Sequence, residues 1–239
     1  MEEKDLICYE NLLASYKRMY AMMDAIHFNS QNTYDIYTRY LASIPKDSKV
    51  IPITHKDIGD HRRIKEYSID RLNLGFIGSE TPYKGLPLLK RVISRLNKLG
   101  YEDSLTLKIY GGRIAVDGIL PNVFYCGKFA QAEMKEIYSE MDLLVVPSIW
   151  YETFSLATIE ALQYGVPVLV SDKVGAKDLV RKYDSRFIFK SEEGLFNIIH
   201  EIIDNKDLLR EYNRRIVEME WDMSMSKHAK QIEKNIYNH

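Results

Sequence analysis

Residues 142–171 read DLLVVPSIWYETFSLATIEALQYGVPVLVS, and this stretch decides the fold of the chain. Two short apolar runs, at 143–146 and 166–170, predict buried strands. Between them, apolar residues recur at helical spacing, namely Leu156, Ile159 and Leu162. Gly165 follows them, where a helix often ends in a left-handed residue. A strand, a helix and a second strand form a βαβ unit, so the sequence predicts two parallel strands.

Two carboxylates in this stretch indicate a binding site. In parallel sheets, ligands bind outside the carboxyl ends of the strands, which places Glu152 and its loop at that edge. Glu160 lies eight residues further on, in a helix that is otherwise largely apolar. Since a buried carboxylate without a partner is costly, we expect Glu160 to face a polar cleft or to hold a partner. The alternative is that both residues are solvated charges at a helix end.

The start of the predicted helix offers a place for an anion. The peptide N–H groups of Thr153 to Leu156 lie at or near this start, and such groups bind anions, most often phosphate. Carboxylates beside an anion site are suited to accept hydrogen bonds from hydroxyl groups. A ligand that carries both phosphate and hydroxyl groups is a nucleotide sugar, which is therefore the predicted ligand.

The pattern P-S-x-x-x-E-T-F-S-L-x-x-I-E-A-L-x-x-G-V-P-V, at residues 147–168, resembles a known motif. It is similar to the E-x7-E segment of the retaining GT-B glycosyltransferases, in particular those of family 4. The resemblance implies that Glu152 contacts the donor sugar and that Glu160 contacts the ribose. Ser155 stands where that family usually has glycine, which keeps a small residue beside the phosphates.

A second segment that resembles the family follows a predicted strand at 72–78. Gly78 is followed by Lys84, as in the family's G-x-x-x-x-x-K-G, and the resemblance implies that Lys84 binds the diphosphate. Such a cation would neutralise charge that grows on the leaving group, so Lys84 and Glu152 are the predicted catalytic residues. The family often has arginine directly after the first glycine. Because Ser79 stands there, we expect weaker charge stabilisation.

The resemblance also suggests where the nucleobase lies. Two further predicted strands, at 105–110 and 122–127, each end at a glycine. In the family the base lies against the loops that follow, so Gly111, Lys128 and Phe129 are candidate neighbours. Taken singly, the glycines at these two strand ends are equally well explained as ordinary turn residues. The complete set of predicted donor-binding residues is Gly78, Ser79, Lys84, Gly111, Lys128, Phe129, Glu152, Thr153, Phe154, Ser155, Leu156 and Glu160.

Composition sets broad limits on the protein. The chain has 239 residues, of which 46% are hydrophobic and 28% charged, with a net charge of −1. This allows one large domain or one and a half ordinary ones, and it gives no reason to expect nucleic-acid binding. Cys8 and Cys126 are far apart, which indicates a reducing compartment without a disulfide framework. With no membrane-spanning apolar run and no signal-peptide pattern, we expect a cytoplasmic protein, with peripheral contact to the inner membrane face as an option.

The two ends of the chain resemble parts of a GT-B enzyme. The first part predicts a helix at 12–23, a strand at 24–30, a helix ending at Pro45 and a strand at 50–53. This order is similar to the end of a GT-B N-terminal domain, although an ordinary αβαβ start to a single domain fits as well. The tail, 221–237, resembles the closing helix that crosses back to that domain, with a packing face of Trp221, Ala229, Ile232 and Ile236.

The predicted fold is therefore α/β. A Rossmann-like parallel sheet with helices on both faces corresponds to the GT-B C-terminal domain, and a partial N-terminal αβ segment precedes it. The predicted divisions are an N-terminal segment with linker at 1–70, a donor-binding domain at 71–220 and a crossover helix at 221–239. Since the first part has room for only a strand or two of an N-terminal domain, we expect either a fragment of a longer enzyme or a short protein that has lost its acceptor half.

Several motifs are absent from the sequence. It has no G-x-G-x-x-G, no G-x-x-x-x-G-K-[ST] and no G-x-S-x-G, which weighs against a dehydrogenase, a P-loop NTPase and a hydrolase. It also lacks the D-x-D pair with which GT-A transferases bind a metal, so neither a metal nor a cofactor is predicted.

The predicted function is transfer of a sugar, with retention, from a nucleoside diphosphate sugar to an acceptor hydroxyl. UDP or GDP is the expected nucleotide, and the acceptor is a saccharide or a lipid-linked molecule, as in polysaccharide or glycolipid synthesis. One alternative is a non-catalytic nucleotide-sugar-binding subunit that needs a partner supplying the acceptor domain. A GT-B-like sugar-nucleotide epimerase is a further one.

Overall fold

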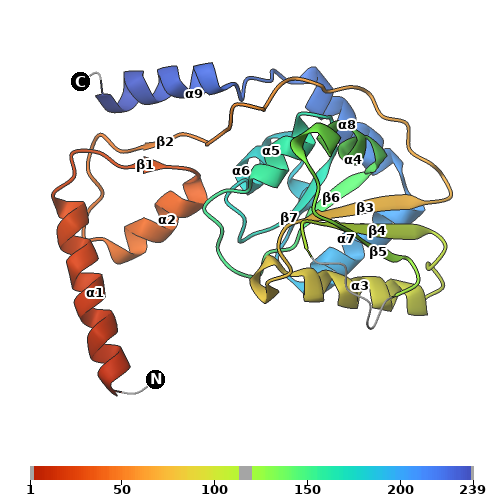
Figure 1. Ribbon diagram of the computed structural model, residues 1–239, viewed down its shortest axis with the longest axis horizontal. Helices are drawn as coiled ribbons and strands as arrows, with labels where there is room; N and C mark the ends of the chain where they lie inside the picture. Colours follow the sequence, from red (N-terminus) through yellow and green to blue (C-terminus); the bar gives the residue numbers. More distant parts are fainter. Residues whose placement is uncertain (1–2, 113–119, 238–239) are drawn as a thin grey trace.

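The larger part of the molecule is built on a six-stranded parallel sheet. The structure is a computed structural model that describes residues 3–112 and 120–237 (Figure 1). The strands lie in the order β5-β4-β3-β6-β7-β8, and each neighbouring pair is parallel. Their bounds are β3 Leu72–Ile77, β4 Leu105–Tyr110, β5 Val123–Gly127, β6 Leu143–Val146, β7 Val168–Ser171 and β8 Ile188–Phe189. The predicted Rossmann-like α/β fold is confirmed.

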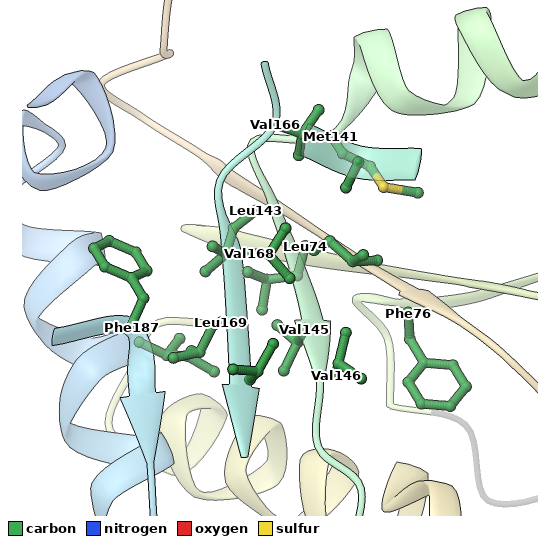
Figure 2. Packing of buried hydrophobic residues seen from close by; sticks show 14 of the residues in the cluster. Leu74, Phe76, Met141, Leu143, Val145, Val146, Val166, Val168, Leu169 and Phe187 are labelled. Carbon is green, nitrogen blue, oxygen red and sulfur yellow. The ribbon is translucent and has the colours of Figure 1, made fainter. Parts of the chain in front are cut away.

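The predicted βαβ unit forms the middle of this sheet. Every residue of β6 and β7 is buried, as expected of strands that are covered on both faces. The two strands are joined by α5 (Leu156–Leu162) and pair in parallel, with Leu144 opposite Val168. Figure 2 shows their valines and leucines packed among the side chains of Leu74 and Phe187.

Helices cover both faces of the sheet. α3 (Leu86–Lys98) and α7 (Glu192–Asp204) lie on one face, while α4 (Met134–Glu140), α5 and α8 (Asp207–Glu218) lie on the other (Figure 1). α6 (Lys177–Tyr183) follows β7. Three short 3₁₀ turns complete this part, η1 Pro82–Lys84, η2 Gln131–Glu133 and η3 Ser185–Phe187.

The N-terminal part has the predicted order of helix, strand, helix and strand, with different bounds. It consists of α1 (Glu3–Ala21), β1 (His27–Phe28), α2 (Gln31–Tyr40) and β2 (Lys49–Val50), with β1 and β2 paired in parallel. The predicted helix at 12–23 in fact begins at residue 3 and ends at residue 21. Three apolar residues of α1, Leu12, Tyr16 and Met19, are exposed.

The predicted strands at 24–30 and 50–53 are also too long. β1 ends after Phe28 because Ser30 already caps α2, where its hydroxyl accepts a hydrogen bond from the Thr33 N–H. β2 ends at Val50, two residues before Pro52, which has no N–H to donate to a sheet.

The C-terminal helix is shorter than predicted and lies beside the N-terminal part (Figure 1). α9 covers Met225–Ile232, and a π-helical turn (η4) covers Glu233–Tyr237. The hydroxyl of Thr54 donates to the Met223 carbonyl at 2.6 Å, just before α9 begins. Of the predicted packing face, Trp221 donates its indole N–H to the Gly59 carbonyl at 2.9 Å, whereas Ala229 is exposed. Residues 238 and 239 of the predicted division 221–239 lie outside the described residues.

Candidate functional site

The two predicted catalytic residues meet at the carboxyl edge of the sheet. Lys84 lies in the turn after β3, and Glu152 lies in the loop after β6. Lys84 Nζ is 2.9 Å from Glu152 Oε2, and the Glu152 side chain is only 16% exposed. The Ser148 hydroxyl donates to the other carboxylate oxygen, Oε1. Glu152 is therefore held at both oxygens, with one of them on a cation.

A glycine allows the two loops to come this close. Gly85 has φ +78°, and a Cβ added to it would lie 1.7 Å from the Pro147 carbonyl oxygen. The Ile149 N–H donates to the Tyr83 carbonyl at 2.9 Å, which joins the same two loops. The positive φ angle and the close approach of Pro147 explain why a glycine follows Lys84 in this segment.

Glu160 has partners, as its position on a largely apolar helix predicted. The Tyr138 hydroxyl donates to Glu160 Oε2 at 3.1 Å, and His55 Nε2 lies 3.2 Å from Oε1. Burial, together with the nearby Glu160 charge, raises the pKa of Tyr138 well above its usual value, so this phenol remains a donor. The alternative of two solvated helix-end charges is wrong, because Glu152 and Glu160 are 16% and 18% exposed and both have partners.

The loop between Glu152 and α5 has both exposed and buried residues, with Thr153 exposed and Phe154 buried. The Thr153 carbonyl accepts hydrogen bonds from two hydroxyl groups of the N-terminal part. Phe154 is buried at 4% exposure and lines a pocket together with Ser30 and Gly175. Ser155 stands at the N-cap position of α5 and makes no side-chain cap bond there. Leu156 is exposed.

A pocket of about 360 Å³ adjoins the loop after β3. It is lined by Ser79, Glu80, Thr81, Gly111, Gly112 and Lys128. Three of the predicted donor-binding residues, Ser79, Gly111 and Lys128, thus come together from three strand ends. Gly78 contributes backbone, since its N–H donates to the Tyr110 carbonyl at 3.0 Å. Phe129 does not line this pocket but lies edge-on to the Tyr110 ring, with 5.9 Å between the ring centroids.

Sequence reasoning missed several residues of the site. Glu80 and Gly112 occupy positions that carry no pattern. Tyr138 reads as one member of an apolar helix stripe, and His55 stands in a charged, irregular segment. Only the fold brings Tyr138 and His55 to Glu160.

The described part of the chain has neither a metal-binding cluster nor a membrane-spanning helix. Residues 3–112 and 120–237 contain no group of three or more His, Cys, Asp or Glu side chains suited to hold a metal ion. Within the same ranges, no helix combines the length and the apolar character needed to cross a bilayer.

Comparison with protein families gives a match over most of the chain. The family described as glycosyl transferases group 1 matches residues 58–219. A GDP-mannose-dependent alpha-mannosyltransferase from Mycolicibacterium smegmatis is 34% identical over 110 residues, which cover 45% of this chain and 27% of that protein. An uncharacterized glycosyltransferase from Methanocaldococcus jannaschii is 30% identical over 112 residues, which cover 44% of this chain and 28% of that protein. The matched segments thus span little more than a quarter of these relatives.

Solved structures match nearly the whole chain. Anabaena Alr3699/HepE, solved in complex with UDP and glucose, has a TM-score of 0.73 at 16% identity, covering 95% of this chain and 67% of that one. Sucrose-phosphate synthase from Thermosynechococcus elongatus has a TM-score of 0.73 at 18% identity, covering 94% and 60%. At these identities the likeness concerns the fold.

Proposed function

This chain belongs to the glycosyl transferases group 1 family, and from that premise we propose that it is a glycosyltransferase, or the donor-binding half of one. It would transfer a sugar from a nucleoside diphosphate sugar to an acceptor hydroxyl, with retention of the anomeric configuration. The proposal includes membership of family 4 and a donor-binding role for the E-x7-E pair, Glu152 and Glu160.

The observation that carries the proposal is the pairing of Lys84 with Glu152 at 2.9 Å. A cation and a carboxylate from loops after different strands meet at the edge where parallel sheets bind ligands. In the proposed mechanism, the bound diphosphate replaces Glu152 as the ion-pair partner of Lys84. Lys84 and the Thr153 to Leu156 amides then stabilise the negative charge that develops on the leaving diphosphate.

The same exchange frees Glu152 for the sugar. A carboxylate released from its lysine accepts hydrogen bonds from sugar hydroxyls and so orients the anomeric carbon toward the acceptor. Glu160, held by Tyr138, would accept from the ribose hydroxyls. No metal or other cofactor is part of this proposal, because lysine and backbone N–H groups supply the positive charge.

The proposed donor is a UDP or GDP sugar. Alr3699/HepE was solved with UDP and glucose, and the mannosyltransferase relative is GDP-mannose-dependent. The pocket lined by Gly111 and Lys128 would hold the base. We further propose a saccharide or lipid-linked acceptor and a cytoplasmic location, with peripheral membrane contact as an option.

The first test is a thermal-shift titration with UDP, GDP, ADP and their sugars. A ligand that binds only the folded state raises the midpoint in proportion to ln(1 + [L]/Kd), so the size of the shift ranks the ligands. We expect one diphosphate family to raise the midpoint of the wild-type chain and Glu160→Ala to lose most of that response. Glu201→Ala, an exposed change on α7, serves as the control and should respond like the wild type. A wild-type chain that responds to no nucleotide would refute the donor site.

A second candidate is a non-catalytic nucleotide-sugar-binding subunit. In the described residues before β3, the sheet consists of β1 and β2 alone. Such a subunit would need a partner that supplies an acceptor domain. Nucleotide release from the donor sugar separates the candidates, since a pure binder releases none. Reversible release coupled to a free sugar epimer would instead indicate an epimerase.

A further inference from the structure

We propose that the start of α2, through the hydroxyl groups of Ser30 and Thr33, positions the loop that carries Glu152. This inference rests on the donor-site function proposed above and adds residues from the N-terminal part to it. Ser30 and Thr33 are positioning residues, because they act on the Glu152 loop and not on the ligand. In Figure 1, the start of α2 lies beside the loops at the carboxyl edge of the sheet. The chain then runs away from these loops toward β2.

Both hydroxyl groups converge on one carbonyl. Ser30 Oγ donates to the Thr153 carbonyl oxygen at 2.7 Å, and Thr33 Oγ1 donates to the same oxygen at 3.1 Å. A carbonyl oxygen has two lone pairs, so these two donors use its whole capacity. Ser30 is 2% exposed and Thr33 is 8% exposed. Thr153 directly follows Glu152, so fixing its carbonyl fixes the backbone from which the Glu152 side chain extends.

Further contacts tie the same helix start to the loop after β7. Asn32 Nδ2 donates to the Lys173 carbonyl at 3.2 Å, and Lys177 Nζ donates to Asn32 Oδ1 at 2.9 Å. The Gln31 N–H donates to Asp178 Oδ2 at 3.2 Å. The loop after β7 in turn pairs with the Glu152 loop, since the Glu152 N–H donates to the Lys173 carbonyl at 3.0 Å. α2 therefore holds both loops together.

The close fit at this point leaves no room for a side chain on Gly175. A Cβ there would lie 2.2 Å from the Thr153 carbonyl oxygen and 2.5 Å from Ser30 Oγ. The three segments around Ser30, Thr153 and Gly175 are thus in direct contact. A loop fixed from three sides keeps its carboxylate in place without a ligand, which lowers the ordering cost of binding.

The first experiment measures hydrogen exchange of the ligand-free chain. The double variant Ser30→Gly/Thr33→Val removes both hydroxyl groups, and glycine is tolerated at an N-cap, so α2 is retained. We expect amides of residues 149–156 to exchange about tenfold faster, with the exchange of β6 and β7 unchanged. The single variant Thr33→Val should show a smaller effect in the same segment, and Thr33→Ser should restore wild-type exchange.

Thr38→Val is the matched control. Thr38 lies on α2 and donates its hydroxyl to the Asp35 carbonyl at 2.8 Å, far from the Glu152 loop. Like Thr33→Val, the variant Thr38→Val removes one threonine hydroxyl from α2. The inference fails if the double variant exchanges at the wild-type rate at 149–156, if Thr38→Val has the same effect, or if Thr33→Ser does not restore protection.

The second experiment measures the affinity for UDP-glucose and GDP-mannose by calorimetry. We expect whichever donor the wild type binds to bind the double variant about fivefold or more weakly, as for the loss of two modest hydrogen bonds. Unchanged affinity together with faster exchange would overturn the positioning role. If the wild type responds to no nucleotide in the thermal-shift titration while exchange rises as expected, the loop contact stands and the donor-site function is refuted.

Discussion

At the scale of single residues, Lys84 and Glu152 neutralise each other in the ligand-free chain. Lys84 is 40% exposed, but Glu152 is only 16% exposed, so removing the lysine leaves a largely buried carboxylate whose charge is no longer neutralised. We therefore expect Lys84→Met to lower the unfolding midpoint at pH 7 and to weaken diphosphate binding about tenfold or more. Calorimetric titration with UDP and GDP measures the affinity, and Lys98→Met, an exposed lysine in the last turn of α3, is the control. Equal affinities for all three chains would contradict the phosphate role of Lys84.

Gly85 and Gly100 both have positive φ angles, but only Gly85 lies against another segment of the chain. Substitutions at the two positions therefore distinguish the cost of backbone strain from the cost of a steric clash. Gly85 has φ +78° and lies against the Pro147 carbonyl, whereas Gly100 has φ +92° with nothing within 4 Å of its added Cβ. Gly100→Ala should cost about 1–2 kcal/mol for the left-handed backbone alone. Gly85→Ala should cost at least about 2 kcal/mol more, because the loops after β3 and β6 must move apart. Urea unfolding of both variants measures the difference, and equal losses would show that the two loops are not in firm contact.

The residues of the site differ in how far the sequence could predict them. Lys84, Glu152 and Glu160 stand in patterned segments, and the structure pairs Lys84 with Glu152. Their donor-binding roles remain predictions. No pattern marks His55, and the apolar stripe that contains Tyr138 indicates only a core position, because both residues reach Glu160 from separate elements of the fold. Spacing along the chain carries no information about such an approach.

At the scale of elements, Asp184 joins α6, η3 and α8. Burial alone would raise the pKa of the Asp184 carboxyl, but hydrogen bonds from Arg186 and the charges of Arg186 and Arg215 outweigh it and hold the pKa below its usual value. Arg215 Nη1 reaches Asp184 Oδ2 at 3.0 Å from α8. Because the pKa of this carboxyl is lowered on folding, the ionised Asp184 stabilises the fold at pH values above the ordinary pKa of 3.8. This stability is lost as the pH falls through the folded-state pKa.

Asp184→Asn should therefore remove part of the acid sensitivity of the fold. We expect it to lose about 1.5–3 kcal/mol at pH 7, as for hydrogen bonds to a charged group, and less as the pH approaches 3. Urea unfolding between pH 3 and 7 measures both effects. Asp207→Asn, which alters an exposed pair with Arg210, should keep the wild-type pH dependence. Parallel pH curves for the wild type and Asp184→Asn would contradict the assignment.

Elements of the sheet domain were far easier to predict than those of the N-terminal part. β6 coincides with the predicted range, because an apolar run reflects burial inside a packed core. In α1, by contrast, Leu12, Tyr16 and Met19 are exposed, so they do not pack in such a core. β1 ends early because Ser30 caps α2, and β2 ends early because Pro52 follows it. Both are local effects that compete with strand pairing.

At the scale of the whole molecule, the sequence predicted a parallel sheet with helices on both faces but not the order of its strands. The order β5-β4-β3-β6-β7-β8 depends on which strand ends meet in space. β3 pairs with β4 along its full length and with β6 at Leu74 and Gly75. The contact between α2 and the Glu152 loop is likewise a property of the complete fold, since it joins residues from opposite halves of the chain.

The central place of β3 has a consequence for how the chain is made. During synthesis, β3, β4 and β5 leave the ribosome before β6 and can already pair, but the edge of β3 that pairs with β6 stays open until β6 emerges. An open, apolar strand edge invites pairing with other chains, and distant strand contacts form slowly. The half-built sheet is therefore the stage at which this protein is most exposed to aggregation, and slower translation between β5 and β6 would lengthen that stage.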